Sequence, residues 1–265
     1  MTTSLLISTY NWPGALQLCL HSIMRQSTLP DEVIICDDGS GKETTDVVKK
    51  FQESSPIPIE HVWQEDEGFR LSAVRNKGFA IAKGDFLIQI DGDLILHRHF
   101  VRDHKRFARE GYFTTGSRVL LSAETSARLL HEDSIDAMSD VRRHNNILNS
   151  LHFPFLHEFM ARRYKSTGKN TYYVKGCNMA FFKKDIIRVN GYNENFTGWG
   201  REDSEIAIRL INSGIKKRFL KFGGICYHIF HKEVSREMEA KNTQMMTEAI
   251  EKKVTRAENG LDKYK

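Results

Sequence analysis

The chain of 265 residues is poor in cysteine and proline, with four and five copies, and no hydrophobic run is long. The four cysteines (Cys19, Cys36, Cys177 and Cys226) are widely separated and form no CxxC pair. This pattern predicts buried free thiols in a reducing compartment and excludes a disulfide scaffold. The longest apolar runs have the length of strands, far short of a membrane span. The first residues lack a basic segment, so we expect no signal peptide and a cytoplasmic location.

The sequence also lacks a strong charge of one sign. A net charge of +5 suits anionic partners such as nucleotide phosphates, but no stripe of alternating aromatic and basic residues indicates binding to nucleic acid. Peripheral contact with the inner face of the plasma membrane is compatible with this charge, although no amphipathic anchor stands out. No internal repeat or low-complexity linker divides the chain, whose length suits one large α/β domain.

The first hundred residues alternate between short apolar runs and helical patterns. Strands are predicted at Ser4–Thr9, Glu32–Cys36, Ile57–Val62 and Asp85–Ile90, and helices at Pro13–Arg25, Thr44–Gln52 and Leu71–Ala82. This alternation predicts a parallel sheet with helices on both faces, and ligands of such folds collect at the carboxyl ends of the strands. The polar segments Tyr10-Asn11, Asp37-Asp38 and Asp91-Gly92-Asp93 all fall at such ends.

The second half is less regular. Residues 122–170 are rich in His, Arg and Asn and could form a helical excursion or a mobile loop. This region contains five basic residues of a candidate acceptor-binding lobe: Arg142, Arg143, His144, Arg162 and Arg163. Beyond it, the pattern predicts a strand at Tyr172–Phe182, helices at Lys184–Val189 and Arg201–Asn212, and one or two strands within Arg218–Phe230.

Asp91-Gly92-Asp93 is the first candidate site. Two carboxylates two residues apart at a strand end can reach the same side of the chain, and Gly92 permits a tight turn between them. Hard oxygen ligands suit Mg²⁺ or Mn²⁺ bridging a diphosphate. A plain polar turn is the alternative, because the DxD pattern is common. The strongly apolar strand before it favours a metal site.

Two acidic residues, Glu202 and Asp203, form a second candidate site. They fall in the first turn of a predicted helix, preceded by glycines on both sides of Trp199. The helix dipole stabilises ionised carboxylates there, and an ionised aspartate can accept a proton from an acceptor hydroxyl. Ordinary capping of the helix N-terminus explains the same residues equally well.

Two histidines and a group of basic residues complete the candidates. His228 and His231 could bind one ion if the chain turns between them, and imidazole ligands shift the preference toward Mn²⁺; a structural role is the alternative. Arg70, Arg75 and Lys77 lie at the start of a predicted helix, where they could bind phosphate or form a solvated face with salt bridges.

Together, these residues resemble the family-2 glycosyltransferases of GT-A fold. The segments STYNWPGALQLCLHSI, IICDDGS and RNKG follow that family's order of motifs. The later segment KGCNMAFFKKDIIRVNGYNENFTGWGREDSEIAIRL resembles the C-terminal region of β-galactosyltransferases and chondroitin-polymerase-type enzymes. The resemblance covers nearly the whole chain. It implies a Rossmann-like, mostly parallel central sheet flanked by helices, with a smaller mixed C-terminal part.

The resemblance also implies roles for individual residues. The nucleotide would be bound by Thr9, Tyr10, Asn11, Asp38, Arg70, Asn76 and the turn Asp91-Gly92-Asp93. The sugar and the acceptor would be bordered by Gly176, Asn178, Trp199 and Gly200. Manganese or magnesium would be held by Asp93 and His231, with Asp91 and His228 as further candidates. Glu202 would hold a sugar hydroxyl, and Asp203 would be the general base.

The enzyme that this resemblance implies is an inverting hexosyltransferase. It would move a sugar from a UDP-sugar to a glycan or lipid-linked saccharide, forming a β linkage. The GWGRED segment favours galactose or N-acetylgalactosamine, while glucose and N-acetylglucosamine stay open. Residues 1–231 would form one domain, with a nucleotide-binding half at 1–100 and an acceptor-binding half at 101–231. Residues 232–265 would form a polar, helical tail.

One departure and two rival functions stand beside this interpretation. Arg201 occupies a position where the galactosyltransferase motif often has a small residue, so it could contact an anionic acceptor or reach solvent. A sugar-phosphate nucleotidyltransferase would carry a Gly-rich, Arg-containing loop where Tyr10 to Pro13 stand. A non-catalytic nucleotide-sugar or glycan-binding module would not need the acids at 202–203.

Overall fold

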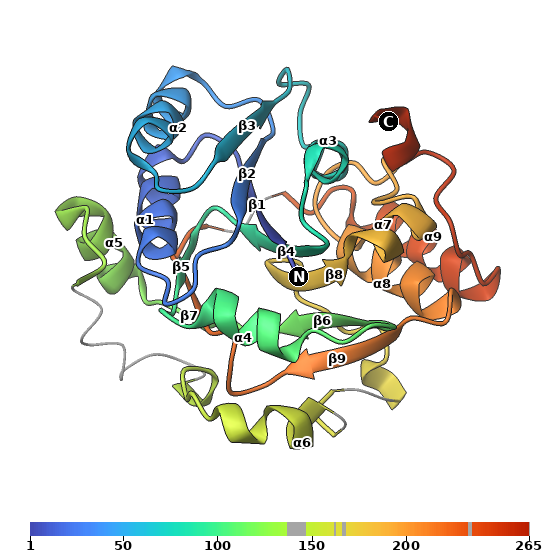
Figure 1. The fold of residues 1–265 in the computed structure, drawn as a ribbon. Coiled ribbons are helices and arrows are strands. Elements are labelled where there is room, and N and C mark those ends of the chain that lie inside the picture. Colours follow the sequence, from blue (N-terminus) through green and yellow to red (C-terminus); the bar gives the residue numbers. More distant parts are fainter. Residues whose placement is uncertain (137–146, 162, 166–167, 233–234, 265) are drawn as a thin grey trace.

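The computed structural model describes residues 1–136, 147–161, 163–165, 168–232 and 235–264. A seven-stranded sheet in the order β3-β2-β1-β4-β8-β6-β9 forms the centre, and helices cover both of its faces (Figure 1). A three-stranded sheet, β5-β10-β7, lies beside it. The expected α/β architecture, a mostly parallel sheet with a smaller mixed part, is confirmed. None of the described helices is long and apolar enough to cross a membrane.

The strands are β1 (Thr3–Thr9), β2 (Glu32–Asp37), β3 (Ile59–Trp63), β4 (Phe86–Asp91), β5 (Leu94–Leu96), β6 (Tyr112–Gly116), β7 (Val119–Leu120), β8 (Asn178–Phe182), β9 (Lys216–Leu220) and β10 (Cys226–His228). The helices are α1 (Pro13–Met24), α2 (Lys42–Ser54), α3 (Leu71–Ile81), α4 (Phe100–Phe107), α5 (Ala123–Glu132), α6 (His157–Ala161), α7 (Lys183–Val189), α8 (Glu202–Asn212) and α9 (Glu239–Glu251). Single 3-10 turns occur at Ile147–Asn149, Pro154–Leu156, Gly168–Asn170 and Leu261–Tyr264.

The first four strands and three helices lie where the sequence predicts them, to within a few residues. Strand β1 pairs in parallel with β2 and β4, and every one of its residues is buried. Its alternate side chains enter two different cores, because successive residues of a strand face opposite sides of the sheet. Leu5 and Ile7 pack with α1 and α2, whereas Leu6 packs with α3. The parallel strands thus end together at one edge.

The pairing of β8 departs from this simple alternation. It lies between β4 and β6 and is antiparallel to both (Figure 1). The predicted strand Tyr172–Phe182 is too long, because only residues from Asn178 onward enter the sheet. The chain before it forms turns, in which the Lys217 ammonium donates to the backbone oxygens of Asn170 and Tyr173.

The region predicted to hold one or two strands near residue 220 contains two, and they belong to different sheets. Strand β9 is the edge of the large sheet, and β10 is the centre of the small one. The connection turns at Phe222 and Gly224, which have φ values of 64° and 53°. Helix α4 and strands β5 to β7 were not predicted; they are too short to show a clear periodicity.

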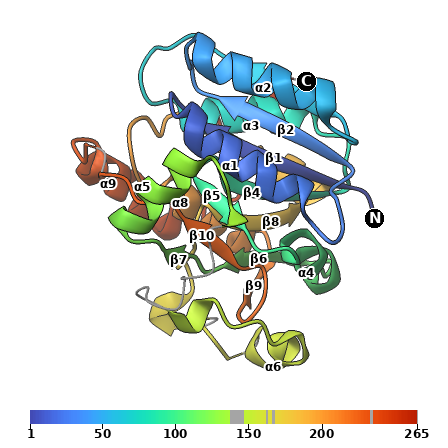
Figure 2. The ribbon, with the colours of Figure 1, turned by 90° about the vertical axis from the view of Figure 1, so that its left-hand side faces the viewer.

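The basic middle and the C-terminal residues contain short helices joined by turns and irregular segments where they are described. Residues 122–170 contain α5, α6 and three single turns, whereas Arg142, Arg143, His144 and Arg162 lie outside the described residues. Helix α9 packs against α8, and Leu261 is buried in the same core as α3. The described residues 235–264 therefore pack against the rest of the domain (Figure 2). The four cysteines are buried and unpaired, as predicted.

Candidate active site

The turn Asp91-Gly92-Asp93 joins β4 to β5 at the edge where the parallel strands end. Two backbone hydrogen bonds fix this turn. The Gly92 amide donates to the backbone oxygen of Ser8 at 2.7 Å, and the Ile229 amide donates to the backbone oxygen of Asp93 at 3.0 Å. A Cβ at Gly92 would lie 3.1 Å from the Ser8 oxygen. A larger residue would therefore push β1 and the turn apart, which explains the glycine.

Asp93 converges with both predicted histidines. Its Oδ2 atom lies 3.3 Å from Nε2 of His228 and 3.3 Å from Nε2 of His231. Strand β10 ends at His228, and the chain then turns, so the two rings approach to 5.0 Å between centroids. Candidate ligand atoms of the three residues all lie within 4.8 Å of one another. We call Asp93, His228 and His231 the metal group.

Two further observations fit the metal group to a divalent cation. Asp93 Oδ1 is buried and has no hydrogen-bond partner among the described residues, as expected of an atom shaped for a ligand. Burial lowers the pKa of His228 to about 4, which keeps its ring in the neutral, metal-binding form at neutral pH. One carboxylate with two imidazoles suits Mn²⁺ better than Mg²⁺.

Asp91 does not belong to the metal group, because its carboxylate faces Arg75 instead. The Arg75 guanidinium, on α3, is only 1% exposed and binds groups from three elements. It donates to Ser8 Oγ at 3.0 Å, to Asp91 Oδ1 at 3.0 Å and to Asp203 Oδ1 at 2.9 Å. Its carbon lies 5.2 Å from the centre of the Tyr192 ring. Arg75 therefore joins the turn after β4 to the start of α8.

Asp203 is held in one orientation by two donors. Arg75 and the Tyr192 hydroxyl both donate to Oδ1, the latter at 2.8 Å. The Oδ2 atom lies against Gly176, where a Cβ would come within 1.6 Å of it. Gly176 is therefore required for Asp203 to occupy this position. We call Arg75, Tyr192 and Asp203 the base group.

Glu202, the first residue of α8, lies next to the base group. Its Oε1 atom is 3.6 Å from Arg75, and its buried Oε2 has no hydrogen-bond partner among the described residues. Burial, together with the nearby Asp203 carboxylate, raises the pKa of Glu202 to about 8. At neutral pH the Glu202 carboxyl group is therefore protonated and can donate a hydrogen bond.

The predicted nucleotide residues at the ends of β1 and β2 do gather in one place. Asp38 is buried and accepts hydrogen bonds from the Arg70 amide, at 2.8 Å, and from the Gln64 side chain. Burial raises the pKa of Asp38. Tyr10 is 51% exposed, and its hydroxyl donates to Asp66 at 2.8 Å. The Asn11 oxygen accepts from the Gly41 amide at 2.9 Å.

Two residues predicted to contact the nucleotide or the sugar, Asn76 and Asn178, instead form hydrogen bonds inside the protein. Asn76 is fully buried. Its side chain accepts a hydrogen bond from the backbone amide of Tyr192 at 2.7 Å and donates one to the backbone oxygen of Tyr192 at 2.9 Å. Asn178 is also fully buried, donating to Ser117 and Gly224 backbone oxygens. Neither side chain can reach a nucleotide or sugar in this structure. Asn76 positions Tyr192, and through it the base group.

The loop of residues 197–201, which we call the Trp199 loop, is hydrogen-bonded to α9. Asn242 donates to the backbone oxygens of Thr197 and Gly200 at 3.1 and 3.0 Å. The loop uses an unusual backbone, with φ of 103° at Gly200 and 75° at Arg201. Arg201 does not simply reach solvent: it donates to Thr243 and forms an ion pair with Glu239, both on α9.

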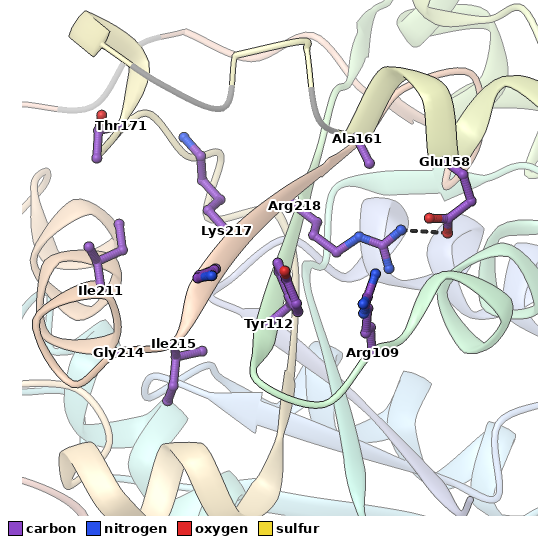
Figure 3. A pocket seen from close by; sticks show the side chains of 11 residues that line it. Arg109, Tyr112, Glu158, Ala161, Thr171, Ile211, Gly214, Ile215, Lys217 and Arg218 are labelled. Carbon is purple, nitrogen blue, oxygen red and sulfur yellow. Dashed lines mark hydrogen bonds and ion pairs between the residues drawn. The ribbon is translucent and has the colours of Figure 1, made fainter.

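A cavity of about 490 Å³ lies away from these residues (Figure 3). It opens at the beginnings of β6 and β9, beside α6, whereas the site lies where β1 and β4 end. Its wall carries the ion pair between Arg218 and Glu158, and none of the predicted site residues lines it. This cavity is therefore separate from the candidate active site.

The fold is that of the GT-A glycosyltransferases. A mannosyltransferase, PcManGT from Pyrobaculum calidifontis, solved with GDP-Man and Mn²⁺, superposes with a TM-score of 0.64 at 17% identity, covering 94% of this chain and 64% of that one. Residues 1–349 of S. aureus TarS, solved with UDP, give 0.65 at 14% identity, covering 100% and 68%. At these identities the likeness concerns the fold.

The chain belongs to glycosyl transferase family 2, whose model matches residues 4–189. Residues 157–232 match a second model, described as the N-terminal domain of galactosyltransferase. The chondroitin synthase of Escherichia coli is 30% identical over 237 residues, which are 85% of this chain and 34% of that protein. Validoxylamine A glucosyltransferase of Streptomyces hygroscopicus subsp. limoneus is 29% identical over 223 residues, 80% and 48%. The chain thus spans a third to a half of these relatives, and it is a glycosyltransferase, as expected.

Proposed function

We propose that this glycosyltransferase moves a sugar from a UDP-sugar to a glycan or lipid-linked saccharide with inversion, using Mn²⁺ or Mg²⁺ and Asp203 as the general base. The observation that carries the proposal is the pair of hydrogen bonds that Arg75 and Tyr192 donate to Asp203 Oδ1. Arg75 also binds Asp91, which begins the turn of the metal group. Donor and base sites are thereby joined through one buried guanidinium.

The donor would lie along the carboxyl ends of β1, β2 and β4. Asp38 and the exposed Tyr10 ring are available to the nucleoside, and Asp93, His228 and His231 would hold the cation. A divalent cation held there would neutralise negative charge on the departing diphosphate. The buried, unpartnered Asp93 Oδ1 supports this assignment. So do the Mn²⁺ and UDP bound by the neighbours PcManGT and TarS.

The acceptor would lie between Asp203 and the Trp199 loop. Because both of its hydrogen bonds are made through Oδ1, Asp203 can accept the acceptor's hydroxyl proton at Oδ2. The freed oxygen then attacks C1 of the sugar from the face opposite the diphosphate, so an α-linked donor gives a β-linked product. The protonated Glu202 would donate to a sugar hydroxyl through its unpartnered Oε2 edge.

UDP release from a panel of UDP-sugars in the presence of Mn²⁺ tests this proposal. We expect release with UDP-galactose or UDP-N-acetylgalactosamine first, with the glucose forms as the next candidates, even without acceptor if slow hydrolysis occurs. Release of pyrophosphate from UTP and a sugar 1-phosphate, without UDP release from any UDP-sugar, would instead identify a nucleotidyltransferase. UDP-sugar binding without any turnover, with or without a saccharide acceptor, would identify a binding module.

A further inference from the structure

Exposed apolar side chains gather in one short segment around α6. Among the described residues, Leu148, Phe155 and Phe159 are 65%, 80% and 54% exposed, and Leu151 and Phe153 are 36% and 39% exposed. We call these five residues the 148–159 surface. Clusters of this kind on a folded protein mark sites of interaction, whereas single exposed apolar residues do not.

Contacts with Phe222 hold the backbone of this segment in place, so its exposed rings have defined positions. Phe153 packs against Phe222 with ring centroids 5.7 Å apart, and His157 Nε2 lies 2.9 Å from the Phe222 oxygen. Phe155 and Phe159 are four residues apart in consecutive helical turns, which places them on one side. In both views α6 lies at the end of the molecule opposite α2 (Figures 1 and 2).

Two positively charged side chains lie beside the 148–159 surface. The Arg163 guanidinium lies 4.1 Å from the centre of the Phe159 ring, and exposed Arg106 lines a small cavity together with Phe155. The described residues of 147–175 include four Lys and Arg residues and one acid, Glu158. The Glu158 carboxylate is paired with Arg218. The surface therefore combines apolar side chains with the guanidinium groups of Arg106 and Arg163, neither of which forms an ion pair with another described residue.

We propose that the 148–159 surface docks onto an anionic lipid membrane. Phe155 and Phe159 would enter the boundary between headgroups and acyl chains, and Arg106 and Arg163 would lie among the lipid phosphates. A second copy of the chain fits less well, because two positive rims would face each other. An acidic saccharide fits less well too, because phenylalanine and leucine offer no hydrogen bonds. The inference does not depend on the proposed sugar transfer.

Sedimentation of the whole chain with lipid vesicles tests the proposal. We expect binding to phosphatidylcholine vesicles that contain phosphatidylglycerol, little binding to phosphatidylcholine alone, and weaker binding at high salt. The double variant Phe155→Ser/Phe159→Ser should lower the partition coefficient at least about tenfold, because two apolar rings no longer leave water. Ile81→Ser, at a 43% exposed position on α3, is the matched control and should bind like the wild type.

Because both rings are exposed, the double variant should keep the wild-type thermal unfolding midpoint. Failure of the wild-type chain to bind anionic vesicles would overturn the proposal, and so would equal binding by the double variant. Sedimentation velocity without lipid tests the alternative that a second copy of the chain binds this surface. A wild-type dimer that the double variant cannot form would assign the surface to a second copy of the chain.

Discussion

The metal group and the base group lie at the same edge of the sheet, yet their charges are satisfied in opposite ways. Asp93 keeps one buried oxygen without a protein partner, whereas Asp203 shares the buried Arg75 guanidinium with Asp91 and Glu202. A carboxylate with an unpartnered oxygen is arranged for an external ligand, and one with two internal donors is arranged for a fixed direction. The difference suggests that donor binding and proton transfer are separable in this site.

Asp203→Asn should separate the two functions most strongly. The amide keeps the size of the side chain but cannot accept the acceptor's proton, so kcat should fall about a thousandfold. UDP affinity in the presence of Mn²⁺ should stay at the wild-type value, measured by titration calorimetry. Asp46→Asn, on the exposed side of α2, is the control substitution. Equal losses of UDP binding and turnover would mean that Asp203 has a structural role.

Asp93→Ala should produce the opposite pattern. Loss of the carboxylate removes the centre of the metal group, so the gain in UDP affinity caused by Mn²⁺ should fall at least about tenfold. His228→Ala and His231→Ala should each give part of this loss. Wild-type activity that persists in excess chelator would contradict the metal assignment.

Arg75→Lys tests whether the base group depends on a forked side chain. Lysine has one ammonium nitrogen in place of the three nitrogens that bind Ser8, Asp91 and Asp203, so it cannot keep all three in their present positions. Unfolding by urea should therefore require about 2 kcal/mol less free energy, and kcat should fall as well. Arg209→Lys is the matched control, since Arg209 is also fully buried and binds Glu205 through two bonds. It should lower stability similarly while the folded enzyme keeps its kcat. Equal kcat losses in both variants would exclude a specific role for Arg75.

Glu202→Gln should give the smallest effect, on stability. Burial raises the pKa of Glu202 from 4.5 to about 8, so the unfolded chain ionises at lower pH than the folded one. The wild-type glutamate therefore costs stability progressively as pH rises from about 4.5 to 8, and glutamine does not. We expect the melting temperature of Glu202→Gln to exceed that of the wild type by a few degrees at pH 8 and to match it at pH 4. A difference independent of pH would contradict the protonated state of Glu202.

The sequence predicts the first half of the fold well because its strands and helices alternate locally. It does not predict the place of β8, because an antiparallel strand between β4 and β6 depends on pairing between residues about ninety positions apart. In the site, Asp93, His228 and His231 converge as their resemblance to known motifs implied. For Arg75 the sequence predicts a phosphate contact or a place on a solvated face, and the buried position of its side chain differs from both. Arg75 lies four residues from both Leu71 and Phe79, which places it on the same side of α3 as these apolar residues. That spacing is the feature of the sequence from which its burial could be predicted.

Asn76 and Asn178 show the limit of reasoning from motifs. Both lie in segments that resemble family motifs, yet both side chains are fully buried and hold backbone in place. A motif marks residues that a site needs, whether they touch the ligand or support a residue that does. The sequence alone does not distinguish these roles, because burial depends on how distant segments pack.

The most direct test of the separable site is a crossed titration of UDP into Asp203→Asn and Asp93→Ala, each with Mn²⁺ and with chelator. The account predicts that Mn²⁺ strengthens UDP binding in Asp203→Asn as it does in the wild type, and that it has little effect in Asp93→Ala. Mn²⁺-dependent binding that is lost in Asp203→Asn, or retained in Asp93→Ala, would contradict it.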